Sequence, residues 1–292
     1  MKDFHGKVAV ITGAASGFGR EFARVAASLG MRLVLADVEH DPLDAAAAEF
    51  SASGAEVLAV RVDVRRAADV EHLADRTIER FGAVHLLFNN AGVGAGGGLI
   101  WESSLNDWEW VLGVNLWGVI HGVRSFVPIM LRQDGECHVV NTASAAGLVS
   151  PQTMGVYNTS KHAVVTLTET LHHDLRLVNA RIGVSLLCPA FVKTGIADAE
   201  RNRPAELGNA APPTASQSAA REASRQAVSA GKLSAADVAR ITFEAIRENR
   251  FYVVPHPAIL PSVELRMQDI MAQRQPSDPF SFRKDVAFKA GG

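Results

Sequence analysis

Short runs of apolar residues alternate along this chain with longer stretches in which apolar positions recur at helical spacing. Most of the short runs are nearly continuous in Val, Leu and Ile, as strands buried on both faces of a sheet are. Strands that alternate with helices predict an α/β fold, a doubly wound parallel sheet with helices on both faces. The seven predicted strands are VAVIT (8–12), RLVLAD (32–37), VLAVRVD (57–63), VHLLFNN (84–90), CHVVNTAS (137–144), GVSLLCP (183–189) and FYVVPH (251–256).

The helical pattern is clearest in four stretches, 103–133, 157–177, 235–248 and 262–274. Asn115 stands in the middle of the longest one, where its intrinsic helix propensity is unfavourable. An Asn that interrupts regular helical hydrogen bonding could direct its backbone carbonyl and amide at an ordered water. Alternatively, Asn115 is a solvent-exposed residue of an ordinary helix.

The length fits a single domain spanning residues 1–292, without an internal repeat. Residues 195–232 are rich in Ala, Ser, Pro and Arg and have little apolar periodicity. We interpret them as a surface lid over a substrate cleft, with a disordered insertion as the alternative. Residues 257–292 form a C-terminal extension, a helix followed by a polar tail that is expected to cover a neighbouring subunit.

Composition narrows the classes of partner. The apolar content of 48% and the mean hydropathy of +0.08 are ample for a continuous core. A net charge of −2, without a basic stripe, disfavours nucleic acid and anionic membranes as partners. No apolar run approaches the roughly 18–20 residues that span a bilayer. The first apolar segment, Val8–Thr12, runs into a glycine-rich turn and is interpreted as a strand, not a secretory signal.

The cysteines and histidines show no metal-ligand spacing, so no metal site is expected. Cys137 and Cys188 lie in or beside predicted buried strands. We interpret them as inert thiols in a reducing compartment, which makes the cytoplasm the expected location. Histidines without a partner at ligand spacing are interpreted as surface or helix-face residues, namely His121, His162, His172 and His173.

The first strand is followed by the glycine-rich turn TGAASGFGRE (12–21), which opens a helix. Gly13 permits a tight turn, Gly17 lets the backbone approach a pyrophosphate, and Gly19 lets the helix pack close to the strand. The free N–H groups and the positive dipole end of the helix favour phosphate at this point. The predicted cofactor-binding residues of the turn are Gly13, Ser16, Gly17, Phe18 and Gly19.

Asp37 ends the second strand, 20 residues after Gly17. A carboxylate at this position can accept hydrogen bonds from the hydroxyl groups of an adenosine ribose. The 2′-phosphate of NADP would be repelled there, and Val38 offers no arginine to hold it. NAD is therefore the expected cofactor. The alternative is that Asp37 is a helix N-cap.

The third and fourth strands end in further candidate cofactor contacts. Side chains at 63–64 could flank an adenine, and the small residues of NNAG (89–92) allow a backbone to lie against a ribose. Each sequence would otherwise be an ordinary turn. The following VGAGGG (93–98) is expected to be a mobile loop, with no chemistry assigned. The predicted cofactor-binding residues here are Asp63, Val64, Asn90, Ala91 and Gly92.

Tyr157 and Lys161 are four residues apart in a predicted helix, so they share one face. Lowering a phenol pKa from about 10 to about 7 requires roughly 4 kcal/mol. An ammonium at about 4 Å, at an effective dielectric of about 20, supplies a free energy of that size. Ser144, at the end of the preceding strand, could hydrogen-bond the oxygen that gains or loses the proton. Alternatively, Tyr157 is a half-buried aromatic residue and Lys161 a solvated neighbour.

The chain contains, in this order, Thr12–Gly13 with Gly17 and Gly19, then Asp63, Asn89–Gly92, Asn115, Ser144, and Tyr157 with Lys161. This series resembles the short-chain dehydrogenase/reductase superfamily, which has a Rossmann fold, over residues 5–195. Ser144 precedes Tyr157 by 13 residues, as it does in that family.

The resemblance implies the catalytic roles. Tyr157 would be the general acid/base, and Lys161 would lower its pKa and bind the nicotinamide ribose. Ser144 would orient the substrate oxygen, and Asn115 would hold a proton-relay water. In CPAFVKT (188–194) the resemblance implies cofactor contacts for Pro189 and, at the carboxamide, for Val192 and Thr194. Ala190 stands where the family usually has Gly, a difference of one methyl group.

Other segments resemble a subgroup with an enlarged substrate region, similar to the Cα-dehydrogenases that oxidise benzylic secondary alcohols of lignin-derived aryl ethers. They are MKDF, GVNLWGVIHG, GIADAERNRPAELG and FYVVPHP. Family resemblance also implies that the long helices pair across the interface of a homodimer or homotetramer. The apolar candidates Leu148, Pro151 and Phe191 favour a bulky, partly aromatic substrate.

Together these features predict an NAD-dependent oxidoreductase that interconverts a secondary alcohol and a ketone. Two alternatives remain on the same fold. One is a non-catalytic NAD(H)-sensing protein, and the other is a lyase or epimerase that retains its cofactor through the cycle.

Overall fold

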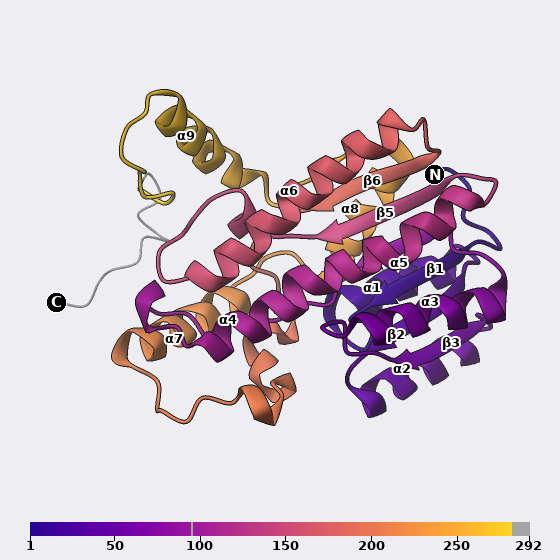
Figure 1. The fold of residues 1–292 in the computed structure, drawn as a ribbon, viewed down its shortest axis with the longest axis horizontal. Helices are drawn as coiled ribbons and strands as arrows, with labels where there is room; N and C mark the ends of the chain where they lie inside the picture. Colours follow the sequence, from indigo (N-terminus) through magenta and orange to yellow (C-terminus); the bar gives the residue numbers. More distant parts are fainter. Residues whose placement is uncertain (95, 282–292) are drawn as a thin grey trace.

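The computed structural model describes residues 1–94 and 96–281, and its strands form one sheet in the order β3-β2-β1-β4-β5-β6-β7 (Figure 1). Each strand pair is parallel. From β1 the chain proceeds outward to β3, returns to β4 and continues to β7, so the predicted doubly wound arrangement is confirmed. The strands are β1 Val8–Thr12, β2 Arg32–Asp37, β3 Val57–Arg61, β4 Leu86–Asn89, β5 Cys137–Thr142, β6 Ile182–Leu187 and β7 Tyr252–Val253.

Several strands end earlier than the apolar pattern predicted. Asp63, Asn90, Ser144 and Pro189 were placed in strands, but they follow the last paired residues of β3, β4, β5 and β6. The chain leaves the sheet at these points, so polar and small side chains gather in loops at one edge. The strand predicted at 251–256 is also shorter, because only Tyr252 and Val253 pair with β6.

The helices follow the strands as crossover connections. The predicted helix 157–177 begins slightly earlier, at Gly155, and the predicted helix 262–274 is Leu260–Met271. The helices are α1 Gly17–Ser28, α2 His40–Ala52, α3 Ala67–Phe81, α4 Leu105–Leu112, α5 Gly118–Arg132, α6 Gly155–Leu177, α7 Ala215–Ser229, α8 Ala235–Glu248 and α9 Leu260–Met271.

Two apolar layers cover the sheet, because successive side chains of a strand point to opposite faces. In β1, Val8 and Val10 join the cluster under α3, α5 and α6, whose helices run along one face in Figure 1. Ala9 and Ile11 join the cluster under α1, α2 and α8. On that side the rings of Phe22 and Phe88 stack at 4.5 Å between centroids, which fixes α1 against β4. The glycine turn before α1 is thereby held at the sheet edge.

α4 and α5 form one continuous helical stretch through a π-helical turn at Gly113–Trp117. By length and composition, Leu105–Arg132 qualifies as a helix that could cross a membrane, which corrects the expectation that no apolar run approaches that size. However, 44% of its most apolar window is buried in the fold. Phe126, Val127 and Met130 pack against the sheet, as the residues of a core helix do.

The segment 195–232 contains two short 3-10 helices, Gly195–Asn202 and Ala205–Leu207, followed by α7. The sequence did not predict α7 because its apolar periodicity is weak. A local signal was present nonetheless, because Thr214 and Gln217 form a reciprocal capping box at its start. In Figure 1, α7 lies on the side of the molecule that carries the carboxyl-end loops, and Thr214 and Ser216 at its start bond to Glu102, shortly before α4.

The C-terminal extension packs on loops at the same edge. Ile259 and Val263 belong to one apolar cluster with Ala145, Val149 and Ala190. Residues 282–292, which include most of the polar tail predicted to cover a neighbouring subunit, lie outside the described residues.

Candidate active site

The glycine turn lies between the carboxyl ends of β1 and β4, where the winding direction of the sheet reverses. In doubly wound sheets this switch point is the usual crevice for ligands. Gly13 and Gly17 adopt φ values of +67° and +52°, in the left-handed region that favours glycine. A Cβ on Gly19 would lie 2.0 Å from the Gly13 carbonyl oxygen, so α1 approaches the turn too closely for any side chain.

Hydrogen bonds join the two loops of this crevice. The Thr12 hydroxyl accepts from the backbone amides of Asn90 (2.9 Å) and Ala91 (3.1 Å). The Asn90 side-chain amide donates to the Thr12 carbonyl oxygen at 3.0 Å. Through these bonds the turn after β1 and the NNAG turn after β4 are fixed to each other.

Asp37 ends β2 at the edge of the same turn. Its carboxylate accepts hydrogen bonds from the amides of Ala15 (2.9 Å) and Glu39 (3.1 Å). Burial raises the pKa of Asp37 despite these two bonds. The N-cap of α2 is Glu39, so Asp37 is not the helix cap considered as an alternative. Two bonds leave capacity on the carboxylate oxygens for further donors.

Asp63 has a structural partner that the sequence did not predict. Its carboxylate receives the Arg65 side chain in a fork, with Nε at 3.1 Å and Nη2 at 2.7 Å. The Val64 carbonyl oxygen lies 2.9 Å from Nδ1 of His121. His121 lies on a face of α5, one of the two positions predicted for it, but it is buried and holds this loop, so the surface position is wrong.

Tyr157 and Lys161 lie one turn apart on α6, with the Lys161 ammonium 5.7 Å from the centre of the Tyr157 ring. The ammonium donates a hydrogen bond of 2.9 Å to the Thr142 carbonyl oxygen at the end of β5. Burial lowers the pKa of Lys161 to about 8. Lys161 is only 3% exposed, so it is not the solvated neighbour considered as an alternative.

The direction of the Tyr157 pKa is the reverse of the one expected. Burial raises the pKa of the phenol above its ordinary value, and the interaction with the Ser144 hydroxyl lowers it by less. The phenol pKa is therefore not brought near neutrality in this structure, because burial penalises the charged phenolate.

Ser144 connects the loops that follow β5 and β6. Its hydroxyl oxygen accepts from the Ala146 amide (3.2 Å) and lies 3.3 Å from the Pro189 carbonyl oxygen. The Ala145 amide donates to the same carbonyl at 2.8 Å. The Pro189 loop is thereby fixed against the residue expected to orient a substrate oxygen.

Asn115 lies in the π-helical turn and is fully buried, so the solvent-exposed alternative is wrong. Its side chain pairs with both backbone groups of Val93, the amide at 2.8 Å and the carbonyl at 3.0 Å. It also donates to the Ser160 hydroxyl at 3.2 Å. A Cβ on Gly92 would stand 3.4 Å from Asn115 Oδ1 and 3.6 Å from Lys161 Nζ. The chain after β4 therefore passes directly beside both side chains.

The loop after β6 brings the last predicted contacts to the crevice. Val192 is buried, and Thr194 faces Gly17, where an added Cβ would lie 3.5 Å from the threonine side chain. Sequence reasoning did not single out His256, whose Nδ1 accepts from the Ala190 amide at 3.2 Å. Because 66 residues separate the two, no local pattern could have paired them.

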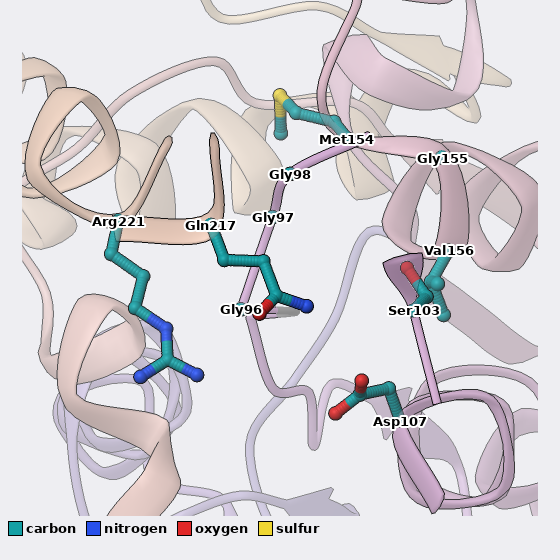
Figure 2. A pocket seen from close by; sticks show the side chains of 10 residues that line it. All are labelled: Gly96, Gly97, Gly98, Ser103, Asp107, Met154, Gly155, Val156, Gln217 and Arg221. Atoms are coloured by element: carbon teal, nitrogen blue, oxygen red, sulfur yellow. The ribbon is translucent and has the colours of Figure 1, made fainter. Parts of the chain in front are cut away.

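A hollow adjoins the first turn of α6, directly before Tyr157. Figure 2 shows Gln217 and Arg221 of α7 on one side of it and Ser103 and Asp107 on the other. Asp107 is already paired with Arg203 at 2.8 Å. Among the residues of this structure that are described, no group of His, Cys, Asp or Glu has the arrangement of a metal site. The hollow is lined by Gly96, Gly97, Gly98, Ser103, Asp107, Met154, Gly155, Val156, Gln217 and Arg221.

Comparison with known proteins agrees with this geometry. Residues 7–205 match the family model described as short chain dehydrogenase. The chain is 37% identical to a CLA biosynthesis dehydrogenase/reductase of Lactiplantibacillus plantarum, over 94% of this chain and 97% of that protein. It is 33% identical to a C alpha-dehydrogenase of Sphingobium, over 98% of this chain and 93% of the relative.

Solved structures are similar over nearly the whole chain. A short chain dehydrogenase/reductase from Burkholderia phymatum, in complex with NAD, has a TM-score of 0.94 and 63% identity, covering 96% of this chain and all (100%) of that one. The apo form of LigO from Sphingobium has a TM-score of 0.76 and 31% identity, covering 98% and 94% of the two chains.

Proposed function

The chain belongs to the short-chain dehydrogenase family, and on that basis we propose that it is an NAD-dependent oxidoreductase interconverting a secondary alcohol and a ketone. One arrangement carries the proposal. Tyr157 and Lys161 share a face of α6, Ser144 lies at the adjoining loop, and all three stand at the sheet edge that carries the glycine turn. The Burkholderia relative, 63% identical, is in complex with NAD, which supports this choice of cofactor.

The residues of the crevice fit a dinucleotide. Gly13 and Gly17 add no side chain at two positions of the turn. Ser16 is the N-cap of α1 but forms no side-chain capping bond, so its hydroxyl is available to a phosphate. Asp37 retains acceptor capacity toward ribose hydroxyls. When bound, NAD supplies the nicotinamide ring that accepts or returns a hydride. The residues proposed to hold it are those of the glycine turn, Asp37, Asp63, Val64, Asn90–Gly92, Tyr157, Lys161, Pro189, Val192 and Thr194.

The side chains of this protein would transfer the proton that joins or leaves the substrate oxygen. With its pKa raised by burial, Tyr157 carries a proton at neutral pH and can donate it to the oxygen of a ketone. Lys161, whose pKa is about 8, is mostly charged at neutral pH and favours the phenolate that forms. Ser144 would hydrogen-bond the substrate oxygen, by turning its hydroxyl away from the Pro189 carbonyl oxygen, to which it donates at 3.3 Å here.

We propose that Asn115 takes part in proton transfer through its backbone groups and not through its side chain. A π-helical turn interrupts the regular i→i+4 bonding of its helix. We extend the proposal to a proton-relay water bound at this turn, next to Lys161. The side chain itself is engaged with Val93 and Ser160, so its own role is to keep the turn in place.

The segment 195–232 is proposed as a lid over the substrate. It closes over the glycine-rich residues 96–98, which line the hollow before Tyr157. Leu148, Pro151 and Phe191 support a bulky, partly aromatic substrate, and the similarity to a C alpha-dehydrogenase supports a benzylic alcohol.

Assembly and location complete the proposal. Leu105, Trp117 and Leu131 are exposed apolar residues of α4, α5 and the turn between them, which supports a homodimer or homotetramer. Cys137 and Cys188 are free, buried thiols, which supports a cytoplasmic location.

The test is a panel of benzylic, alicyclic and steroid alcohols and their ketones, assayed at 340 nm with NAD and with NADP. We expect turnover with NAD on at least one secondary alcohol. Tight NADH binding without turnover across the panel would instead indicate a sensing protein. Product formation without net change at 340 nm would indicate a lyase or epimerase.

A further inference from the structure

An ion pair joins the start of the lid to the corner after β2. Arg201 Nε lies 2.9 Å from Glu39 Oε1, and Arg201 Nη2 lies 2.8 Å from Glu39 Oε2, so the contact is a two-point fork. The two residues are 162 positions apart in the chain. Arg201 Nη1 donates in addition to the carbonyl oxygens of Gly195 (3.2 Å) and Asp198 (3.0 Å). The guanidinium is therefore held in place by the Glu39 carboxylate on one edge and by two backbone carbonyls on the other.

This corner adjoins the carboxylate proposed to bind the adenosine ribose. The Glu39 amide donates to Asp37 Oδ1 at 3.1 Å, which places the two acidic residues side by side. The Asp37 charge also contributes to raising the pKa of Arg201, after the larger contributions of Glu39 and Asp198. The residue directly after Asp37 is Val38, so the local sequence has no arginine at this corner. Arg201, from a distant part of the chain, supplies one.

The charges at this corner determine how strongly it would bind the 2′-phosphate of NADP. Asp37 and Glu39 are acidic, and the positive charge of Arg201 is matched by Glu39. A phosphate group carries about −1.5 to −2 charge at neutral pH and binds well to a guanidinium fork. With its fork occupied by Glu39, Arg201 cannot serve that purpose.

We propose that Glu39 determines the preference for NAD by occupying Arg201, an arginine that would otherwise bind the 2′-phosphate of NADP. The inference rests on the proposed dinucleotide site and assigns Glu39 and Arg201 as specificity-determining residues. Loss of the Glu39 charge would leave Nε and Nη2 directed at the same corner, because Nη1 remains bound to the Gly195 and Asp198 carbonyls.

The experiment measures binding of NAD⁺, NADP⁺ and 2′,5′-ADP by calorimetry to four forms of the full chain, namely wild type, Glu39→Gln, Arg201→Gln and the double variant. For Glu39→Gln we expect NADP⁺ and 2′,5′-ADP to bind at least about tenfold more tightly, as a new charge-assisted contact would provide. NAD⁺ affinity should change by less than about threefold, since Asp37 is retained. The double variant should lose the gain for both phosphate-bearing ligands.

Asp44→Asn is the matched control, because it removes one acidic charge from the first turns of α2, close to Glu39 in the chain, without touching Arg201. An equal gain in Asp44→Asn, or a gain that persists in the double variant, would show a general charge effect and overturn the inference. NAD⁺ binding to Glu39→Gln with no gain for NADP⁺ would overturn it as well, while leaving the proposed function intact. Failure of the wild type to bind NAD⁺ would overturn both.

Discussion

The Lys161 ammonium donates a 2.9 Å hydrogen bond to the Thr142 carbonyl oxygen, the last residue of β5. This bond fixes the first turns of α6 to the sheet edge. Tyr157, one turn earlier on the same helix, is thereby held beside that edge. Lys161 therefore has two effects, one on the position of α6 and one on the charge beside the phenol.

Tyr157→Phe removes the proposed proton donor while keeping the ring. We expect turnover to fall by about 10²–10⁴-fold, the range for loss of a general acid. NADH affinity, measured by fluorescence, should stay within about twofold, since the glycine turn, Asp37 and Lys161 are all retained. Comparable losses of turnover and of NADH affinity would mean that the residue is structural.

The dependence of ketone reduction on pH should follow the ionisation of the Lys161 ammonium. Its pKa of about 8 means that the positive charge is present below this pH and is lost above it. Tyr157, whose pKa is raised, keeps its proton over the same range. We expect kcat/KM to be level below pH 8 and to fall by about tenfold for each further pH unit.

Lys161→Arg provides the control for that profile, because arginine stays charged to about pH 12. The variant should lose the falling limb even if its overall rate is lower. A limb that stays near pH 8 in Lys161→Arg would assign the titration to another group.

Gly19→Ala tests the closeness of α1 to the turn. The added Cβ would lie 2.0 Å from the Gly13 carbonyl oxygen, so the backbone must move. We expect the free energy of unfolding to decrease by about 1–3 kcal/mol. NAD affinity, measured by calorimetry, should fall at least tenfold, by about 1.4 kcal/mol or more.

Gly195→Ala is the comparison for that variant, since its Cβ would meet only Arg201, at an ordinary 3.7 Å. It should bind NAD nearly as the wild type does. Normal NAD binding by Gly19→Ala would contradict the role of the turn.

Gly98→Ala tests the lid. Gly98 has a φ of +102°, and an added Cβ would lie 2.5 Å from Gln217 Cγ of α7. We expect α7 to be displaced, so that KM for the substrate rises several-fold and trypsin cleaves at Arg221 and Arg225 faster. NAD affinity should be unchanged, because the glycine turn is not touched.

Gly54→Ala separates displacement of the lid from backbone strain. Its φ of +91° is also left-handed, but no atom lies within 4 Å of the added Cβ. It should lose stability without any change in KM. Equal effects of the two variants on KM would show that contact with α7 is not what matters.

The local parts of the site were predictable because they depend on short spacings. The glycine turn follows from residues 12–21, and the common face of Tyr157 and Lys161 follows from helical geometry. The π-helical turn at Asn115 was anticipated as an interruption of the helix, but not its form. The Asn115 side chain bonds to Val93, 22 positions away, and no sequence spacing indicates that contact.

The pKa of Tyr157 shows most clearly what could not be predicted from the sequence alone. A calculation from one lysine charge predicted a lowered value, whereas burial raises it in the folded chain. Desolvation depends on every element that covers the phenol, and a local motif does not contain that information.

By itself the sequence determined the alternation of strands and helices, the glycine turn and the order of the side chains proposed to be catalytic. Each of these depends on neighbours within a few residues of one another. Only the tertiary structure decided which distant groups meet, such as Thr12 with Asn90 and Arg201 with Glu39. The reason is physical, because a parallel sheet gathers the carboxyl ends of separate strands at one edge, and both contact and burial arise there.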